Sequence, residues 1–298
     1  MKKRIFSILT ALCLCLTLLP TVAAAKETAG TATEVKTSDE LVGALADHDK
    51  AVVKLVENTV AVAPGRKIES GTETKFMAKA SNYGTISGGT FEAEVTNNGT
   101  ISGGTFNGSV EREVSNGADF LAALADPTIT TIKLMREIWV DETETVKELT
   151  IDRAVTLVEG GEYAGCNLLL RCPLTIAEGG VLTLDGLEGV VSLNPYKGMV
   201  VNGRLTVGAG CEVIFEGDQS FLTINEGGTV MTVRTTNAEA AESGLLSLGK
   251  NVALTVDGTL VNNGRLSASD MENLKKAASI GGDLILNGVT VDKDYTLD

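Results

Sequence analysis

The sequence has few aromatic residues and a single histidine, His48. Aromatic residues make up 4% of the 298 residues, although 43% of the chain is hydrophobic. A single histidine excludes a zinc site built from several histidines. A Ser-His-Asp catalytic triad would have to use His48, because the chain has no other histidine. His48 aligns with Pro127 in an internal repeat described below, so we expect it in a solvent-facing loop.

The short motifs that mark nucleotide and redox sites are also missing. The sequence contains no phosphate-binding loop, no Cys-x-x-Cys pair and no dinucleotide-binding fingerprint. We therefore assign no catalytic residue, no cofactor-binding residue, no metal ligand and no cofactor. Whether the protein catalyses a reaction is left open at this point.

Positive charge is scarce, since 25 Lys and Arg residues face 39 Asp and Glu residues, for a formal net charge of −14. An acidic protein repels nucleic acid and anionic membrane surfaces. We therefore expect no nucleic-acid partner and, because only one long apolar run is present, no membrane insertion once that run is removed.

That apolar run belongs to a predicted signal peptide at residues 1–25. Lys2–Arg4 are basic, Ile5–Leu19 are almost continuously apolar, and Ala23–Ala25 form a cleavage pattern. An uncleaved anchor is the alternative, but an apolar run of about 15 residues is short of the ~20 that span a bilayer. We expect a secreted, extracellular protein with a short linker at 26–36, and we leave cell-surface association open.

Three cysteines follow the predicted signal peptide: Cys166, Cys172 and Cys211. An odd number in an exported chain leaves at least one thiol free or intermolecular. Cys166 and Cys172 are close enough in sequence to pair, and the alternative is that all three are small buried residues of the core.

Internal repeats are present on two scales. The octamer Gly84–Phe91 recurs letter for letter as Gly99–Phe106. A longer repeat relates 40–55 to 119–134, and each copy predicts an amphipathic helix followed by a β-strand. We therefore divide the chain into a first helix-plus-strand unit at 37–112, which contains the octamers, and a main β-solenoid at 113–298.

Beyond residue 145 the pattern predicts a series of short strands. Leu-Thr-Ile or Leu-Thr-Val recurs at residues 149, 174, 205, 222 and 254, separated by Gly-containing turns such as Asn202-Gly203. A last helix is predicted at Asp270–Ala278, with Ser269 and Glu272 as its capping box, and a strand at Asp283–Leu286. Four asparagines are candidates for amide ladders at corners: Asn97, Asn98, Asn262 and Asn263.

These repeats favour an all-β, right-handed parallel β-helix, or solenoid, with short amphipathic capping helices. Asn-Gly turns are also hairpin signals, so an antiparallel sandwich is the rival fold. The return of like apolar residues in successive units favours stacked coils, as does the low aromatic content. An amphipathic helix at 40–46 would cover the open first coil of such a stack, and its copy at 119–125 would open a second coil stack or cover a seam.

The segments Asp119–Leu124, Thr131–Leu134, Leu149–Asp152 and Val155–Leu157 together resemble the start of a pectate-lyase-like right-handed β-helix domain of secreted and surface bacterial proteins. The resemblance extends as a pattern over 35–298 and implies the fold. It implies no particular reaction, because the superfamily includes both enzymes and adhesins.

Few residues are candidates for ligand contact. Asp141–Glu144 could bind calcium or form a solvated acidic turn. Trp139, the only tryptophan, could stack on a sugar or pack at a strand edge. The arginines Arg153, Arg171, Arg204, Arg234 and Arg265 are dispersed. Arg204 and Arg265 each follow Asn-Gly, which suggests equivalent turns on different coils. A basic stripe there could meet acidic glycans, and equivalent structural placement explains the spacing equally well.

We therefore expect a secreted, non-catalytic β-solenoid for extracellular binding or surface structure, with an adhesin-like role and glycans or cell-surface proteins as partners. The alternative is a polysaccharide lyase or glycoside hydrolase that acts on acidic glycans. Such enzymes need several carboxylates and a basic residue in one groove, and the sequence alone does not group them. A third reading is a subunit of a larger surface assembly.

Overall fold

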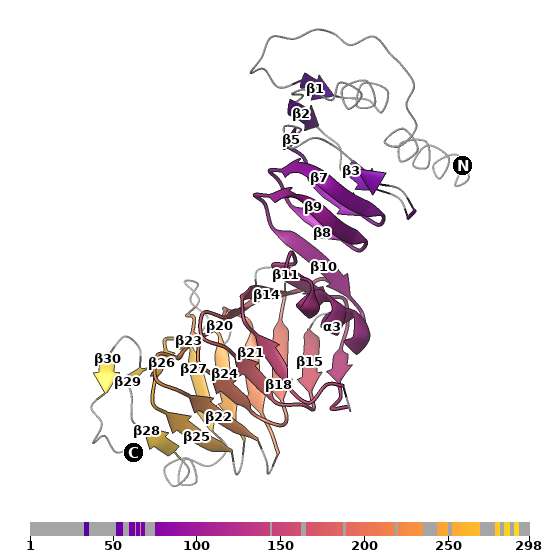
Figure 1. Cartoon of the computed structure of the whole chain (residues 1–298). Helices are drawn as coiled ribbons and strands as arrows, with labels where there is room; N and C mark the ends of the chain where they lie inside the picture. The colour runs from indigo at the N-terminus through magenta and orange to yellow at the C-terminus, as the bar shows by residue number, and fades with distance from the viewer. Residues whose placement is uncertain are drawn as a thin grey trace, which may run out of the picture. The chain divides into compact units, whose positions relative to one another are not determined.

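A computed structural model describes residues 33–35, 52–55, 60–62, 64–65, 67–68, 75–143, 145–161, 165–186, 189–217, 220–234, 243–249, 252–268, 278–280, 283–286 and 289–291. The chain forms two compact units, residues 1–113 and 114–298, which are described separately (Figure 1). The predicted signal peptide, the first helix at 40–46, His48, Glu144 and residues 270–277 of the predicted last helix lie outside the described residues. Ala278, the end of that predicted helix, instead begins a strand, β28.

Unit 1 is built from short coils, in which stacked residues such as Asn82 and Asn97 are 15 positions apart in the sequence. One sheet has the order β1-β2-β5-β7-β4, with β9 also paired to β7, and contains β1 Thr33–Val35, β2 Val52–Leu55, β5 Lys75–Phe76, β7 Thr85–Phe91, β4 Lys67–Ile68 and β9 Thr100–Phe106. A second row consists of β3 Val60–Val62, β6 Ala80–Asn82, β8 Val95–Asn97 and β10 Val110–Val114. The two octamers become β7 and β9, which pair in parallel with like residues side by side, such as Phe91 with Phe106.

Identical side chains stack in the interior of unit 1. The rings of Phe76, Phe91 and Phe106 are stacked with centroid separations of 4.5 and 5.1 Å. The buried amides of Asn82 and Asn97 form a ladder, in which Nδ2 of Asn82 donates to Oδ1 of Asn97 over 2.7 Å. The predicted ladder role of Asn97 is thus confirmed.

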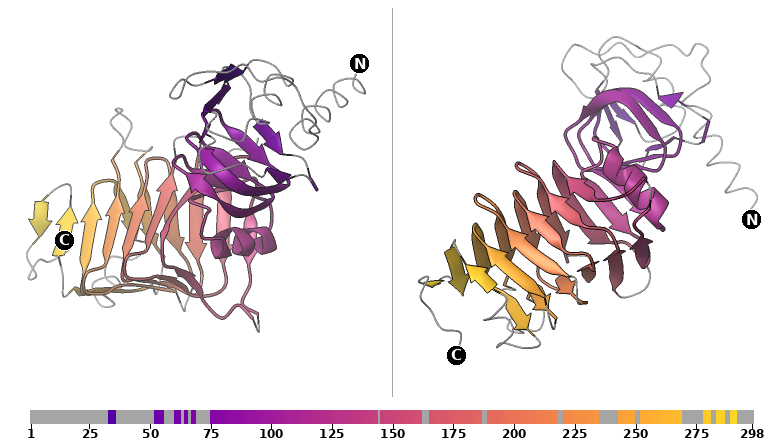
Figure 2. Two further views of the ribbon diagram at one scale, coloured as in Figure 1. Left: turned by 45° about the horizontal axis from the view of Figure 1, so that its top comes forward. Right: turned by 60° about the horizontal axis from the view of Figure 1, so that its bottom comes forward.

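Unit 2 is a three-sided coil whose successive strands belong to three parallel sheets in turn (Figure 2). Sheet 1 contains β11 Thr131–Leu134, β14 Ala154–Glu159, β17 Val181–Asp185, β20 Arg204–Val207, β23 Thr229–Thr232, β26 Thr259–Asn262, β29 Asp283–Leu286 and β30 Val289–Val291. Sheet 2 contains β12 Ile138–Val140, β15 Cys166–Leu170, β18 Val191–Pro195, β21 Glu212–Phe215, β24 Leu245–Leu248 and β27 Arg265–Ala268. Sheet 3 contains β13 Leu149–Ile151, β16 Leu174–Ile176, β19 Met199–Val201, β22 Phe221–Ile224, β25 Ala253–Val256 and β28 Ala278–Ile280.

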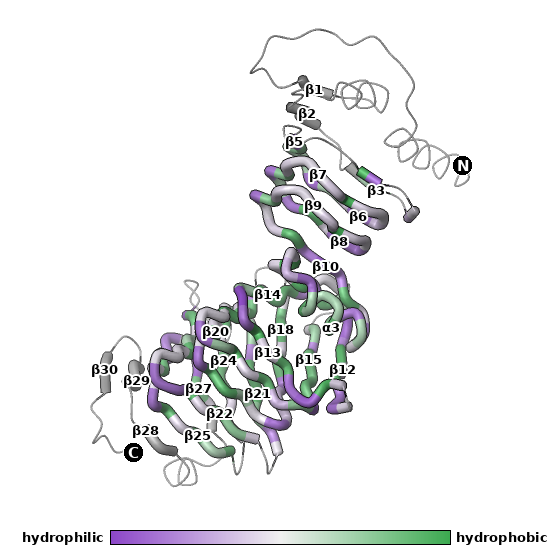
Figure 3. Tube along the Cα trace, viewed as in Figure 1, coloured by the Kyte–Doolittle hydropathy of each residue, from purple (hydrophilic) through white to green (hydrophobic). Residues whose placement is uncertain are grey.

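This arrangement confirms the predicted parallel β-helix and not the sandwich. Every strand pair described in unit 2 is parallel except β29 with β30. Buried and less buried positions alternate along most strands, as expected when one face lines the core. Hydrophobic colour lies along strands such as β15 and β24 in Figure 3, and hydrophilic colour gathers at corners.

The Leu-Thr-Ile/Val repeats do not all occupy the same place in the coil. Sheet 3 stacks Leu149, Leu174, Met199, Leu222 and Leu254 in register. The coil from Leu222 to Leu254 is the longest of the four coils that separate these residues. The triplet at Leu205 belongs to sheet 1, in β20. The expectation that all five triplets are equivalent was therefore wrong. Strands of both sheets carry the Leu-Thr pattern, and one strand of sheet 3, Met199–Val201, lacks it.

The glycine turns between sheets 3 and 1 have a steric cause. In Glu178-Gly179-Gly180 the first glycine has φ = 78°, in the left-handed region that favours glycine. A Cβ on Gly180 would overlap the carbonyl oxygen of Ile151 in the preceding coil, and a Cβ on Gly203 would overlap that of Gly180. Close stacking of consecutive corners thus explains why glycine returns at this corner of the coil.

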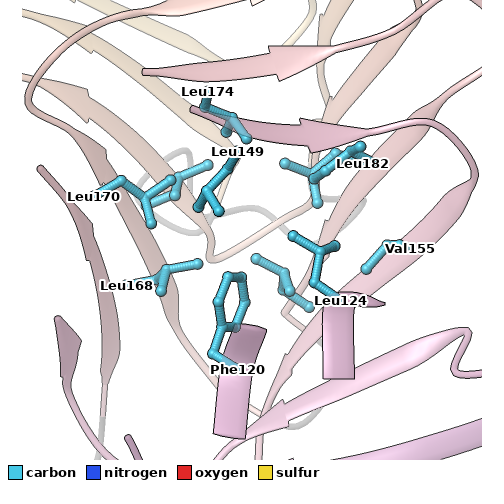
Figure 4. A pocket seen from close by; sticks show the side chains of 11 residues that line it. Phe120, Leu124, Leu149, Val155, Leu168, Leu170, Leu174 and Leu182 are labelled. Carbon is cyan, nitrogen blue, oxygen red and sulfur yellow. The ribbon is translucent and has the colours of Figure 1, made fainter. Parts of the chain in front are cut away.

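Helix α3, Gly117–Ala125, lies at the N-terminal end of the unit 2 stack, as predicted for 119–125. Asn116 caps it by accepting from the amide of Asp119 over 2.9 Å. Phe120 and Leu124 project toward Leu149, Leu168 and Leu182 around an apolar cavity of about 10 Å³ (Figure 4). The helix therefore covers the open end of the coil, as capping requires.

Arg153 holds the C-terminal end of α3. Its Nη2 donates to the carbonyl oxygens of Ala123, Leu124 and Asp126 at 3.3, 3.0 and 2.8 Å. These carbonyls lack partners within the helix, and they carry the negative end of its dipole. Burial lowers the pKa of the guanidinium, while Asp152 and Asp126 act in the opposite direction. Arg153 is thus a structural residue of the cap.

All three described cysteines are buried in unit 2 as free thiols, so Cys166 and Cys172 do not form the disulfide that their spacing would allow. Burial raises the pKa of each, and that of Cys211 reaches about 11. Sγ of Cys166 donates to the carbonyl oxygen of Leu134 at 3.1 Å. The alternative reading, three small core residues, is confirmed.

Candidate functional site

The outer face of sheet 2 gathers the most varied polar and aromatic side chains of unit 2. The strand register places residue 139 beside 169 and 194, and the flanking positions follow the same alignment. We call this surface the Trp139 face, and it consists of Glu137, Trp139 and Asp141 on the first coil, Asn167, Leu169 and Arg171 on the second, and Ser192, Asn194 and Tyr196 on the third.

Trp139 is the centre of a chain of contacts on this face. Its side chain is 40% exposed. The indole Nε1 donates to Oε1 of Glu137 over 2.7 Å, and Nδ2 of Asn167 donates to the other carboxylate oxygen over 3.4 Å. The guanidinium carbon of Arg171 lies 4.3 Å from the ring centroid, and its Nη1 is 3.2 Å from Oδ1 of Asp141. The tryptophan thus has a fixed indole edge and a cation on its ring.

The neighbouring positions continue this row with an apolar residue and an unpaired acceptor. Leu169 is 5% exposed although strand alternation places it on the outer face, so neighbouring groups cover it. Oδ1 of Asn194 is buried and accepts no hydrogen bond within the part of the chain that the structure describes. A buried acceptor without a partner is costly, and its burial keeps it out of reach of a bound molecule.

The residues proposed from sequence for ligand binding do not all come together. Trp139 and Asp141 do, through Arg171, but Asp141 is engaged in an ion pair and Glu144 lies outside the described residues. Arg204 begins a strand of sheet 1 and Arg265 begins a strand of sheet 2. The expected equivalence of their turns was therefore wrong, and the two do not form a basic stripe.

Metal and membrane sites are not apparent in the described part of the chain. Among these residues no group of three or more His, Cys, Asp or Glu could hold a metal ion. No helix among them is long and apolar enough to cross a membrane.

Comparison with known families concerns the segment that carries α3 and the first two coils of the Trp139 face. Residues 111–186 match a family described as a "putative pectate lyase-like adhesive domain". The resemblance predicted from sequence is confirmed. The pectate lyase-like match covers Glu137 to Arg171 and ends before Asn194. Searches of curated proteins and of solved structures find no match to this chain.

Sequence reasoning noted Trp139, treated Arg171 only as one of several dispersed arginines, and missed their contact. Trp139 lies in β12 and Arg171 directly follows β15, and the coil that joins these strands is longer than the coil that follows on the same sheet. The signal that could have found the pair is the alternation of Glu137, Trp139 and Asp141 along and beside β12, opposite Asn167 and Arg171 on the next coil.

Proposed function

We propose that this chain is an extracellular, non-catalytic β-solenoid protein that binds surface molecules in an adhesin-like role, with the Trp139 face as its contact surface. The observation that carries the proposal is the position of Trp139 and Arg171 inside the segment that matches an adhesive domain. Tryptophan, tyrosine and arginine are the residue types that most often dominate binding energy at protein interfaces. All three lie on this one face.

The coil supports such a role mechanically. Side chains on successive coils are held about 4.8 Å apart by backbone hydrogen bonds, so the face is rigid before a partner arrives. The capped N-terminal end and the buried thiols remove two routes to nonspecific association. Secretion and association with a cell surface are part of this proposal, and fractionation of producing cells tests them.

The binding experiment is an array of glycans and extracellular proteins, probed with calcium and with chelator. The wild-type chain is expected to bind at least one class, and Trp139→Ala is expected to weaken that binding by tenfold or more, about 1.4 kcal/mol or above. The matched control is Tyr83→Ala, because Tyr83 is an aromatic residue of unit 1 with 48% exposure.

Two results would overturn the proposal. Cleavage of any glycan in the panel would establish an enzyme of the lyase or hydrolase type. Equal loss of binding in the Trp139 and Tyr83 variants, or no loss in either, would move the contact surface away from sheet 2.

A further inference from the structure

Arg171 occupies a composite site formed by an aromatic ring and a carboxylate. Its guanidinium lies over Trp139 and pairs with Asp141, yet both charged side chains remain more than half exposed, at 54% and 59%. Exposed ion pairs and cation–π contacts each contribute only about 0.5–1 kcal/mol. Arg171 is therefore held weakly, and another cation can replace it.

The site persists without Arg171, because other groups orient the ring. Nε1 of Trp139 is bonded to Glu137, and Glu137 is in turn bonded to Asn167. Neither contact uses the guanidinium. Removing the arginine side chain should therefore leave an indole face already placed for a cation, with the exposed carboxylate of Asp141 two residues away on the same coil.

The charge of the surroundings selects the kind of partner. Glu137 and Asp141 lie on the face, and the register places Glu212 beside Ser192 on the next coil, so three carboxylates lie on or beside a face with one guanidinium. The whole chain has a net charge of −14. An acidic polysaccharide is repelled by this field, whereas a basic partner is attracted.

A polypeptide fits the rest of the row better than a lone cation does. Leu169 and then Asn194 follow Trp139 at a spacing of about 4.8 Å per coil. A basic protein segment supplies lysine or arginine side chains for Trp139 and Asp141, and its backbone can lie along the half-buried Asn167 and Tyr196 beside them.

We propose that the indole face of Trp139 and the carboxylate of Asp141 form a receptor for a lysine or arginine side chain of a partner protein, and that Arg171 occupies this receptor in the free protein. The inference rests on the proposed function, in that the same face is the contact surface. It adds the partner class, a basic protein segment, and an internal competitor that lowers affinity until the partner displaces it.

The test uses the single tryptophan of the chain as the reporter. Fluorescence of Trp139 is titrated with a Gly-Arg repeat peptide, with a Gly-Glu repeat peptide of equal length, and with neutral oligosaccharides. Arg171→Ala is expected to bind the Gly-Arg peptide roughly five- to thirtyfold more tightly than wild type, since two contacts of about 0.5–1 kcal/mol each no longer compete. Adding Asp141→Asn to that variant is expected to remove the gain.

The control for lost positive charge is Arg204→Ala, which removes an exposed arginine from sheet 1. It should leave the affinity reported by Trp139 unchanged, and circular dichroism verifies the fold of each variant. Equal or weaker peptide binding by Arg171→Ala overturns the inference, as does an equal gain in Arg204→Ala. A fluorescence response to oligosaccharides alone would make the face a sugar platform instead.

Failure of the inference is distinguishable from failure of the proposed function. If the array detects a partner that Trp139→Ala abolishes while Arg171→Ala gains nothing, the contact surface stands and the cation receptor falls. If Arg171→Ala binds the Gly-Arg peptide more tightly but the array detects no partner, the cation receptor is supported and the adhesin-like role is rejected.

Discussion

Units 1 and 2 are both stacks of parallel coils, but their coils differ in length and in the residues that fill the interior. Unit 1 has the shorter coils, and its described interior stacks phenylalanine on phenylalanine and asparagine on asparagine. Unit 2 has longer, three-sided coils, and one of its interior columns runs Leu149, Leu174, Met199, Leu222 and Leu254. The described interior of unit 1 thus stacks identical residues, whereas this column of unit 2 accepts methionine among leucines.

Side chains on the surface of unit 1 also connect neighbouring coils, as Asp141 and Arg171 do in unit 2. The coils of unit 1 are tied by pairs one coil apart, such as Lys79 with Glu94 at 2.9 Å and Asn107 with Glu92 at 2.8 Å. The bond from Asn107 and the charge of Lys75 lower the pKa of the Glu92 carboxyl. The stacked identical side chains in the interior and the side-chain pairs on the surface therefore both fix the strand register of unit 1.

The largest expected effect breaks the phenylalanine stack. Phe91 is fully buried between Phe76 and Phe106, so Phe91→Ala should lower the free energy of unfolding of unit 1 by about 3–5 kcal/mol. Hydrogen exchange of amides in 75–110 measures it. Phe106→Ala is the control and should cost less, because Phe106 is only partly buried. A loss well below the range for such truncations, under about 1 kcal/mol for Phe91→Ala, would refute the importance of the stack.

A smaller, pH-dependent effect belongs to unit 2, where all described thiols lie. Burial raises the pKa of Cys211 from 9.0 to about 11, so the folded state keeps the proton while the unfolded state loses it. The stability from this group is complete below pH 9 and declines by about 2–3 kcal/mol as the pH rises to 11.

Urea unfolding of wild type and Cys211→Ala between pH 7 and 11, followed by Trp139 fluorescence, tests this expectation. The stability advantage of wild type should shrink by that amount across the window, because the variant has no thiol at 211. A constant difference between the two proteins at every pH would show that Cys211 is not buried in its folded state.

The smallest effect sharpens the contrast between the two interiors. Met199 is buried between Leu174 and Leu222, so Met199→Leu should change the free energy of unfolding by less than about 1.5 kcal/mol. The matched change in unit 1 is Asn97→Leu, which removes the acceptor for Asn82 and should cost about 1–3 kcal/mol. Equal costs in denaturant unfolding would erase the proposed difference.

The sequence predicts most of the fold because coils use local and repeated signals. The octamers, the Asn116 cap and the strand at Thr131–Leu134 are all readable from adjacent residues. Register in unit 2 is not, because coil length varies at the corners and one Leu-Thr pattern serves two sheets. The Trp139 face depends on that register, so only its individual residues could be named from sequence.

The last described strand changes the edge on which sheet 1 ends. β30 runs antiparallel to β29, with Leu284 opposite Val291 and Leu286 opposite Val289. Each earlier strand of that sheet in unit 2 pairs in parallel with the strand of the next coil. The reversed polarity of β30 interrupts that pattern, so the edge at this end of the sheet runs opposite to the strands of the coil and does not continue their parallel pairing.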